Sequence, residues 1–277
     1  VVVIENAEEK EEDEKLKEEA IPMPKKIKHY IGADLEVGEI RNRSKQDDAS
    51  KVSTGNLFRG KNLKRVIFSG IPWACEGLGV YGIGVFLPIL VLALGLDNAT
   101  SGAHAGHSVE AIDKVINSVE MTAWINFFIL PGFILGLLLV NKVYHVSLQM
   151  WGFILCGLGL IVLLVGYEFG LPVWVAIMGF MMFEVFLNAG PHLMTFIIPS
   201  EIYPVADRGE GAGLAAAIGK IGAVLGVLFI PMLLEWGGVE LVLWVSITVQ
   251  FIGAIVTKIY GDAVLPRTKA GYSINKH

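Results

Sequence analysis

The sequence predicts an all-α membrane protein, built as a six-transmembrane-helix bundle. Two observations carry this prediction. The mean hydropathy is high, at +0.58, and the chain contains six apolar runs of about 20 residues, the length that crosses the hydrocarbon core of a bilayer. Charged residues concentrate toward the two ends of the chain. The predicted spans are residues 66–96, 119–140, 148–167, 173–198, 211–234 and 239–260.

This pattern divides the chain into three parts. Residues 1–58 are predicted to be an acidic cytoplasmic linker, largely flexible with a short helix, because Glu11 and Lys15 have the i,i+4 spacing of a solvated helix. A specific acidic docking site is the less favoured interpretation. Residues 59–262 form the predicted bundle, and residues 263–277 form a cytoplasmic tail. Because the sequence begins with Val1 rather than methionine, whether the chain is a fragment of a longer protein stays open.

The distribution of Lys and Arg predicts that both termini are cytoplasmic, since short loops rich in these residues stay on that side of the membrane. The loops on the opposite side contain Lys114 as their basic residue. The basic residues of the predicted cytoplasmic side are Arg59, Lys61, Lys64 and Arg65 before the first span, Lys142, Arg208, and then Lys258, Arg267, Lys269 and Lys276 after the last span.

Two ionisable residues lie deep inside predicted spans. Lys220 in the fifth span is about 14 Å from the cytoplasmic side, and Glu76 in the first span is about 15 Å from it, at 1.5 Å rise per residue. An ionisable side chain at this depth is costly and by default marks a pathway for a substrate or an ion. We expect the two groups to pair. A purely structural ion pair that holds two helices together is the alternative.

A polar stripe is predicted on the fourth span. Glu184, Asn188, His192 and Thr195 follow spacings of four, four and three, which places them on one face of a helix. We expect this face to line a cavity, with Asn188 level with Lys220. An interhelical hydrogen bond is the alternative for Asn188, and for His192 a packed histidine is the favoured interpretation.

Glycines recur in the first and fifth spans, where they let helices approach closely, bend or slide. Packing and gating both explain them. They are Gly77, Gly79, Gly82 and Gly84 in the first span, and Gly219, Gly222 and Gly226 in the fifth.

Three motifs resemble those of a known family. Residues 199–204 read P-S-E-I-Y-P, residues 219–223 read G-K-I-G-A, and residues 188–192 read N-A-G-P-H. They resemble the P-x-E-x-F/Y-P, G-K-x-G-A and N-F-G-P-N motifs of the phosphate:proton symporters in the major facilitator superfamily. The tail P-R-T-K-A-G at residues 266–271 resembles the P-E-T-K-G ending of sugar porters.

The resemblance implies a fold of twelve helices in two halves, with the substrate held between them. This chain would be the C-terminal half, made of two inverted three-helix repeats. The acidic linker would be the central cytoplasmic loop. The other half of the site would come from residues missing here or from a second polypeptide.

The resemblance also implies roles for individual residues. Lys220 and Asn188 would bind the substrate. Glu76 would replace the proton-coupling aspartate of a W-x-x-x-D-x-x-x-Y arrangement in which Trp73 and Tyr81, each displaced by one residue, would contact the substrate. Glu184 occupies the place in the second repeat that Glu76 has in the first, and we expect it to couple protons as well.

A cytoplasmic gate is expected at Glu201, Arg208 and Lys142. Glu201 and Arg208 match the motif after the fourth span, whereas residues 141–145, N-K-V-Y-H, lack most of the G-x-x-x-D-R-x-G-R-R loop of the family. Lys142 is the basic residue that this loop keeps.

The function expected from these features is proton-coupled symport of phosphate or another small anion by alternating access, in a multi-pass protein of the cell membrane. A proton-coupled sugar or organic-acid transporter is the first alternative. A non-transporting half that acts as a membrane interaction partner is the second. No enzyme, cofactor or metal site is predicted, although His104 and His107 have H-x-x-H spacing. The net charge of −5 argues against nucleic acid as a partner.

Overall fold

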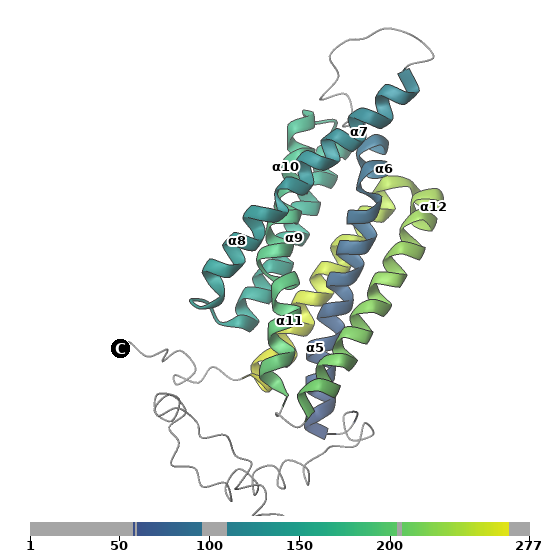
Figure 1. Cartoon of the computed structure of the whole chain (residues 1–277). Coiled ribbons are helices and arrows are strands. Elements are labelled where there is room, and N and C mark those ends of the chain that lie inside the picture. The colour runs from purple at the N-terminus through teal and green to yellow at the C-terminus, as the bar shows by residue number, and fades with distance from the viewer. Residues whose placement is uncertain (1–57, 59, 96–109, 204–206, 266–277) are drawn as a thin grey trace, which may run out of the picture. The chain divides into compact units, whose positions relative to one another are not determined.

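The computed structural model describes residues 58, 60–95, 110–203 and 207–265, all within one compact unit, Val52–His277. These residues are helical apart from short turns (Figure 1). The predicted linker, Phe58 apart, and the predicted tail after Leu265 lie outside the described residues, as do His104 and His107. The elements are α5 (Gly60–Leu78), η1 (Gly79–Gly84), α6 (Val85–Ala93), α7 (Glu110–Phe127), α8 (Ile129–Val140), α9 (His145–Glu168), α10 (Val173–Ala189), α11 (Pro191–Ile202) and α12 (Arg208–Val264).

Among the described residues, five helical segments are long and apolar enough to cross a membrane, where the sequence predicts six spans. The fifth segment, α12, contains the last two predicted spans. It is interrupted at Gly237 and Gly238, which have non-helical backbone angles. Gly238 has a φ of 67°, in the left-handed region that glycine enters at little cost. Figure 1 shows α12 doubling back, with a green first arm and a yellow second arm that run in opposite directions.

Two other segments change their course at glycines. The first segment passes from α5 into a π-helix, η1, before it continues as α6. The fourth breaks at Gly190, where φ is −117° and ψ is −91°, and Pro191 starts α11 without a backbone N–H. Consequently Asn188 and His192 stand on two different helices rather than on one continuous face.

The glycines that the sequence singles out hold α5 against the first arm of α12. A Cβ atom at Gly222 would lie 2.1 Å from the Ala74 carbonyl oxygen, and one at Gly77 would lie 2.7 Å from the Gly219 carbonyl oxygen. These distances leave no room for a methyl group. The two backbones are therefore in direct contact, next to Glu76 and Lys220.

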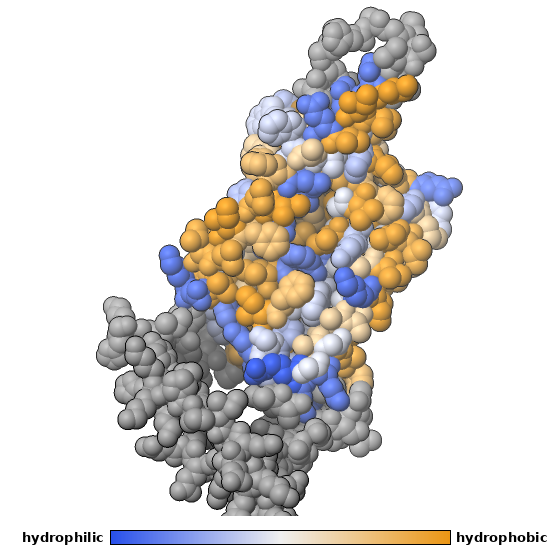
Figure 2. All heavy atoms as spheres, viewed as in Figure 1, coloured by the Kyte–Doolittle hydropathy of each residue, from blue (hydrophilic) through white to orange (hydrophobic). Residues whose placement is uncertain are grey.

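The outer surface of the bundle is apolar as well as its interior. Large hydrophobic side chains such as Trp124, Leu137 and Leu228 are more than half exposed, at 60%, 60% and 58%. Figure 2 shows hydrophobic residues over much of one face, with hydrophilic residues in separate patches. Soluble monomers rarely expose apolar area on this scale, and a surface of this kind fits contact with lipid.

Candidate functional site

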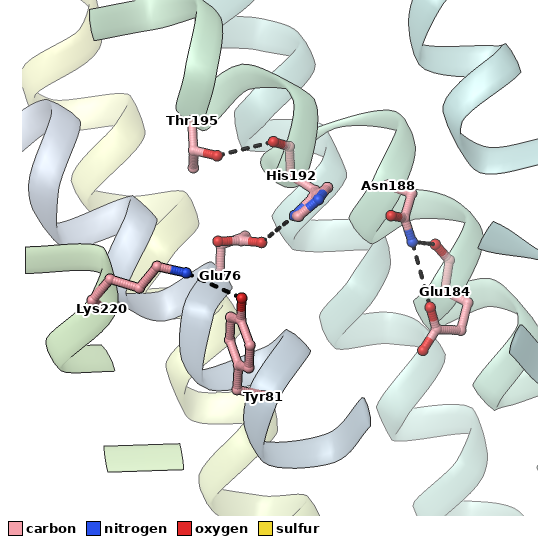
Figure 3. A network of polar contacts seen from close by, with 7 residues as sticks. All are labelled: Glu76, Tyr81, Glu184, Asn188, His192, Thr195 and Lys220. Atoms are coloured by element: carbon pink, nitrogen blue, oxygen red, sulfur yellow. Dashed lines mark hydrogen bonds and ion pairs between the residues drawn. The ribbon is translucent and has the colours of Figure 1, made fainter. Parts of the chain in front are cut away.

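A buried carboxylate links α5 to α11. The Glu76 side chain is only 3% exposed, and its Oε1 is hydrogen-bonded to Nδ1 of His192, whose side chain is 28% exposed (Figure 3). A buried charge without a partner would cost several kcal/mol, so the imidazole is what makes this position of Glu76 tenable.

A cation lies on the neighbouring helix. The Lys220 ammonium, on the first arm of α12, donates a hydrogen bond of 3.1 Å to the Tyr81 hydroxyl of η1. The same nitrogen lies 4.9 Å from the centroid of the Tyr81 ring, within range of a cation–π interaction. Lys220 is exposed and Tyr81 is 38% exposed. The ammonium therefore keeps an open side.

The predicted ion pair between Lys220 and Glu76 is not formed. Throughout the described part of the chain, His192 is the partner of the Glu76 carboxylate, and Tyr81 is the partner of the Lys220 ammonium. The reason is direction rather than depth, since Glu76 points to α11 whereas Lys220 points to η1 (Figure 3). The two side chains still leave adjoining stretches of helix, at the contact of Gly77 with Gly219.

Aromatic rings pack against the His192 imidazole. The Trp73 and Phe196 rings meet edge to face with centroids 5.1 Å apart, and the His192 ring lies 5.9 Å from Phe196 and 5.4 Å from Phe133. Trp73 also covers Gly219, where a Cβ atom would lie 2.6 Å from Trp73 Cδ1. Trp73 thus stands between the Glu76 pair and the start of the Lys220 turn.

A second polar pair lies on α10. The Asn188 side-chain amide donates to the Glu184 backbone oxygen at 2.8 Å and to Glu184 Oε2 at 3.4 Å, and both residues are 5% exposed. Asn188 packs toward α8, since its Cβ lies 3.0 Å from the place of a Cβ at Gly132. The described residues contain no contact between Asn188 and Lys220.

The predicted stripe on the fourth span is therefore corrected. The break at Gly190 separates Glu184 and Asn188 from His192 and Thr195, whose hydroxyl donates to the His192 carbonyl oxygen at 2.9 Å. The favoured interpretation of His192 as a packed histidine stays a prediction: the ring packs against Phe133 and Phe196, and it is also hydrogen-bonded to Glu76. The signal that could have identified His192 is its place in the series of polar residues on the fourth predicted span, together with the carboxylate of Glu76 in the first span.

The other end of α11 carries a second histidine contact. His145 Nδ1, at the start of α9, lies 2.8 Å from Glu201 Oε2, and His145 Nε2 lies 2.9 Å from the Val140 oxygen that ends α8. The partner of Glu201 is thus His145, which the sequence analysis did not select, rather than Arg208 or Lys142. Lys142 and Arg208 are both exposed.

Tyr203 closes the same end of the bundle. Its hydroxyl lies 3.2 Å from the Ser69 hydroxyl of α5. Burial raises the pKa of the Tyr203 phenol above its ordinary value, against the opposing effects of the Ser69 hydrogen bond and the Arg65 charge. The phenol therefore stays neutral and joins α11 to α5.

A row of buried polar residues on the second arm of α12 was not predicted. Ser246, Gln250 and Thr257 are each 0% exposed and lie four and seven residues apart. Gln250 Nε2 lies 2.8 Å from the place of a Cβ at Gly79, so a larger residue at position 79 would require this amide to shift. A count of polar residues at helical spacing within the sixth predicted span would have revealed the row.

Comparison with known proteins gives consistent similarities. The family model described as "Sugar (and other) transporter" matches residues 10–270. The chain is 26% identical over 220 residues to inorganic phosphate transporter PT2 of Toxoplasma gondii, covering 78% of this chain and 36% of that protein. It is 28% identical over 206 residues to the repressible high-affinity phosphate permease of Neurospora crassa, covering 71% and 34%.

A bacterial relative is also similar. The inner membrane metabolite transport protein YgcS of Escherichia coli is 24% identical over 216 residues, which cover 77% of this chain and 42% of that protein. The chain thus spans about two fifths, or less, of the length of the curated relatives it matches.

Proposed function

Because this chain belongs to the sugar (and other) transporter family of the major facilitator superfamily, we propose that it forms one half of a proton-coupled symporter for phosphate or another small anion. The half works by alternating access, with the substrate held between it and a second six-helix half. The second half comes from the same polypeptide or from another one. The phosphate transporters among its relatives favour this substrate class.

The observation that carries the proposal is the state of Lys220. Its ammonium is exposed and, among the described residues, has a tyrosine rather than a carboxylate as its partner. An ammonium inside a span that is not neutralised by a carboxylate is a ready binding group for an anion. Tyr81 holds it from one side, and Trp73 covers the adjoining turn.

Glu76 supplies the proton-coupling position. Glu76 lies on the helix next to Lys220, and its negative charge would repel an anion that approaches Lys220. When the Glu76 site gains a proton from the outside, this repulsion ends and the anion binds. After the two halves rock, the proton and the anion leave on the inside. Glu184 would couple protons, and Asn188 would reach the substrate, in another conformation of the cycle, since here these two residues bond to each other.

The topology proposed for the chain has six crossings, with the two arms of α12 as the last two. Both termini are cytoplasmic, and the protein lies in the cell membrane. Residues 1–58 serve as the central cytoplasmic loop, residues 59–262 as the bundle, and residues 263–277 as the tail. Glu201, Lys142 and Arg208 belong to the cytoplasmic gate, and the contact of Glu201 with His145 supports adding His145 to it.

A sugar or an organic acid is the second candidate substrate, favoured by the family description and by the metabolite transporter among the relatives. In that case Lys220 would serve as a latch between helices. Competition separates the candidates, since phosphate displaces a bound phosphate analogue but leaves a sugar site occupied. A non-transporting half would show neither binding nor uptake.

The experiment is uptake of labelled phosphate by vesicles that contain the full-length protein, with and without an inward proton gradient. We expect the gradient to stimulate uptake and Lys220→Ala to reduce it by about 10-fold to 100-fold, which corresponds to the loss of one hydrogen bond to a charged group. Lys220→Arg, which keeps the charge, should retain more activity. Undiminished uptake by Lys220→Ala would overturn the proposal.

A further inference from the structure

We infer that the coupled proton is carried by His192, with Glu76 as its permanent counter-ion. The inference rests on the proposed function and goes beyond it, because it moves the proton from a carboxylate to an imidazole on a different helix. Two features of the pair carry it, which are the unequal exposure of its members and the free ring nitrogen of His192.

The two members of the pair differ in their access to protons. The Glu76 side chain is 3% exposed and lies behind the imidazole, whereas the His192 side chain is 28% exposed. A proton that arrives from water therefore meets the imidazole first. The carboxylate accepts a hydrogen bond from Nδ1 and needs no proton of its own to be stabilised.

The second ring nitrogen is available for this proton. Nδ1 faces Glu76, and within the described residues Nε2 has no hydrogen-bond partner. With Nδ1–H donating to the carboxylate, Nε2 is the bare nitrogen of the neutral ring. Protonation at Nε2 gives an imidazolium and changes the net charge of the pair from −1 to 0. The hydrogen bond between α5 and α11 is kept throughout.

The neighbouring groups are few. Glu184 of α10 interacts electrostatically with His192, and Phe133 and Phe196 contribute apolar rings from α8 and α11. From α5 the ring faces Glu76, and from α12 the nearby charge is Lys220, which is bonded to Tyr81. The Thr195 hydroxyl is bonded to the backbone of His192 and not to its ring. Neutralising the Glu76 pair therefore removes a negative charge beside Lys220 without disturbing the ammonium itself.

Asparagine is the matched replacement for testing this role. The N-A-G-P-H sequence at residues 188–192 has a histidine where the motif it resembles, N-F-G-P-N, has an asparagine. An asparagine amide donates a hydrogen bond to a carboxylate as Nδ1–H does, but it binds no proton near neutral pH. His192→Asn thus separates proton binding from hydrogen bonding. His192→Gln provides the same comparison with a longer side chain.

The experiment measures the number of protons taken up per phosphate bound to the full-length protein. Calorimetry at about pH 6.5, near the pKa of an ordinary imidazole, in buffers of different ionisation enthalpy gives this number. Phosphate itself also changes protonation, but this contribution cancels between variants. For each phosphate bound, we expect the wild type to take up as much as about one proton more than His192→Asn or His192→Gln does.

The possible outcomes distinguish a failure of His192 as the proton carrier from a failure of the proposed transport function. If the variants bind phosphate with the same proton uptake as the wild type, Glu76 or another group is the carrier and the inference is overturned, while the proposed function stands. If the wild type binds no phosphate, the proposed function falls and the inference falls with it. A lower proton uptake per phosphate in both His192→Asn and His192→Gln than in the wild type, with phosphate binding retained, supports the inference.

Discussion

At the scale of single residues, the site depends on charged groups that are held by aromatic and imidazole partners rather than by each other. Tyr81 contributes twice to the position of Lys220, through its hydroxyl and through its ring face. A typical hydrogen bond contributes about 0.5–1.5 kcal/mol net, and an exposed cation–π contact about 0.5–1 kcal/mol. The hydroxyl and the ring can therefore be separated by substitution.

We predict a graded series of phosphate affinities. Tyr81→Phe removes the hydroxyl and should weaken binding by about 2-fold to 10-fold, since it removes one solvent-exposed hydrogen bond of the Lys220 ammonium. Tyr81→Leu removes the ring as well and should weaken binding further, yet less than Lys220→Ala does. Equilibrium binding of labelled phosphate to purified full-length protein measures the order. Equal affinities for Tyr81→Leu and the wild type would show that Tyr81 does not position the ammonium.

The pair of His145 and Glu201 allows a second prediction. Both side chains are partly exposed, at 21% and 34%, so the pair should contribute only about 0.2–1 kcal/mol. A double-mutant cycle of His145→Gln and Glu201→Gln, measured by reversible unfolding in detergent, should give a coupling in this range. The same cycle with Arg208→Gln in place of His145→Gln should give a coupling near zero. A larger coupling of Glu201 to Arg208 than to His145 would show that His145 is not the main partner of Glu201.

The sequence identified the important charges more reliably than their partners. Hydropathy marks Lys220 and Glu76 because each interrupts an apolar run. The rise of a helix gives their depth, but the rotation of each helix about its axis is set by tertiary packing. Depth alone therefore predicted an ion pair where the structure has two separate contacts. His192 was placed on the Asn188 face and interpreted as a packed histidine, because the sequence does not show that the chain breaks at Gly190 or that the ring meets Glu76.

At the scale of elements, the helices come into close contact where glycines leave room for the neighbouring backbone. Hydropathy predicted six spans, and most of their outer ends lie within a few residues of the ends of the five apolar segments among the described residues, because the bilayer fixes the length of a span. The breaks within them were not predicted. The π-helix at Gly79–Gly84 and the reversal at Gly237 depend on how neighbouring helices pack, and an isolated glycine in a sequence does not indicate which of these roles it has.

We predict that Gly222→Ala destabilises the protein and that Gly213→Ala does not. Both glycines lie on the first arm of α12. A Cβ atom at Gly222 would lie 2.1 Å from the Ala74 oxygen, whereas one at Gly213 would meet no atom within 4 Å. Overpacking of this kind costs about 1–3 kcal/mol, and alanine at an exposed helical site gains up to about 1 kcal/mol over glycine. Thermal unfolding of the two variants in detergent measures the difference. Equal melting temperatures would mean that α5 and α12 are not in contact there.

At the scale of the whole molecule, the proposed second half would account both for the open side of the Lys220 ammonium and for the short length of the match. The chain spans 34% to 42% of the relatives compared above, and an anion held by Lys220 alone would have most of its surface uncovered. A second half that faces this one would complete the contacts. The uptake experiments therefore need the full-length protein.

The last prediction concerns the path of the chain across the membrane. Cys75 and Cys156 are both buried, so single cysteines introduced at exposed positions can be labelled selectively with a membrane-impermeant maleimide. Phe169→Cys and Trp236→Cys replace side chains that are 76% and 69% exposed, at the turn after α9 and at the bend of α12. If the chain crosses six times with cytoplasmic termini, both should react on intact cells.

Lys142→Cys, in the turn between α8 and α9, is the matched control and should react only after permeabilisation. The decisive position is Trp236, because it reaches the outer surface only if α12 crosses, reverses at Gly237 and Gly238, and crosses again. Labelling of Phe169→Cys without labelling of Trp236→Cys would leave α12 with fewer crossings than proposed. Labelling of Lys142→Cys on intact cells would show that the chain has the opposite orientation in the membrane. The proton would then drive the anion in the opposite direction.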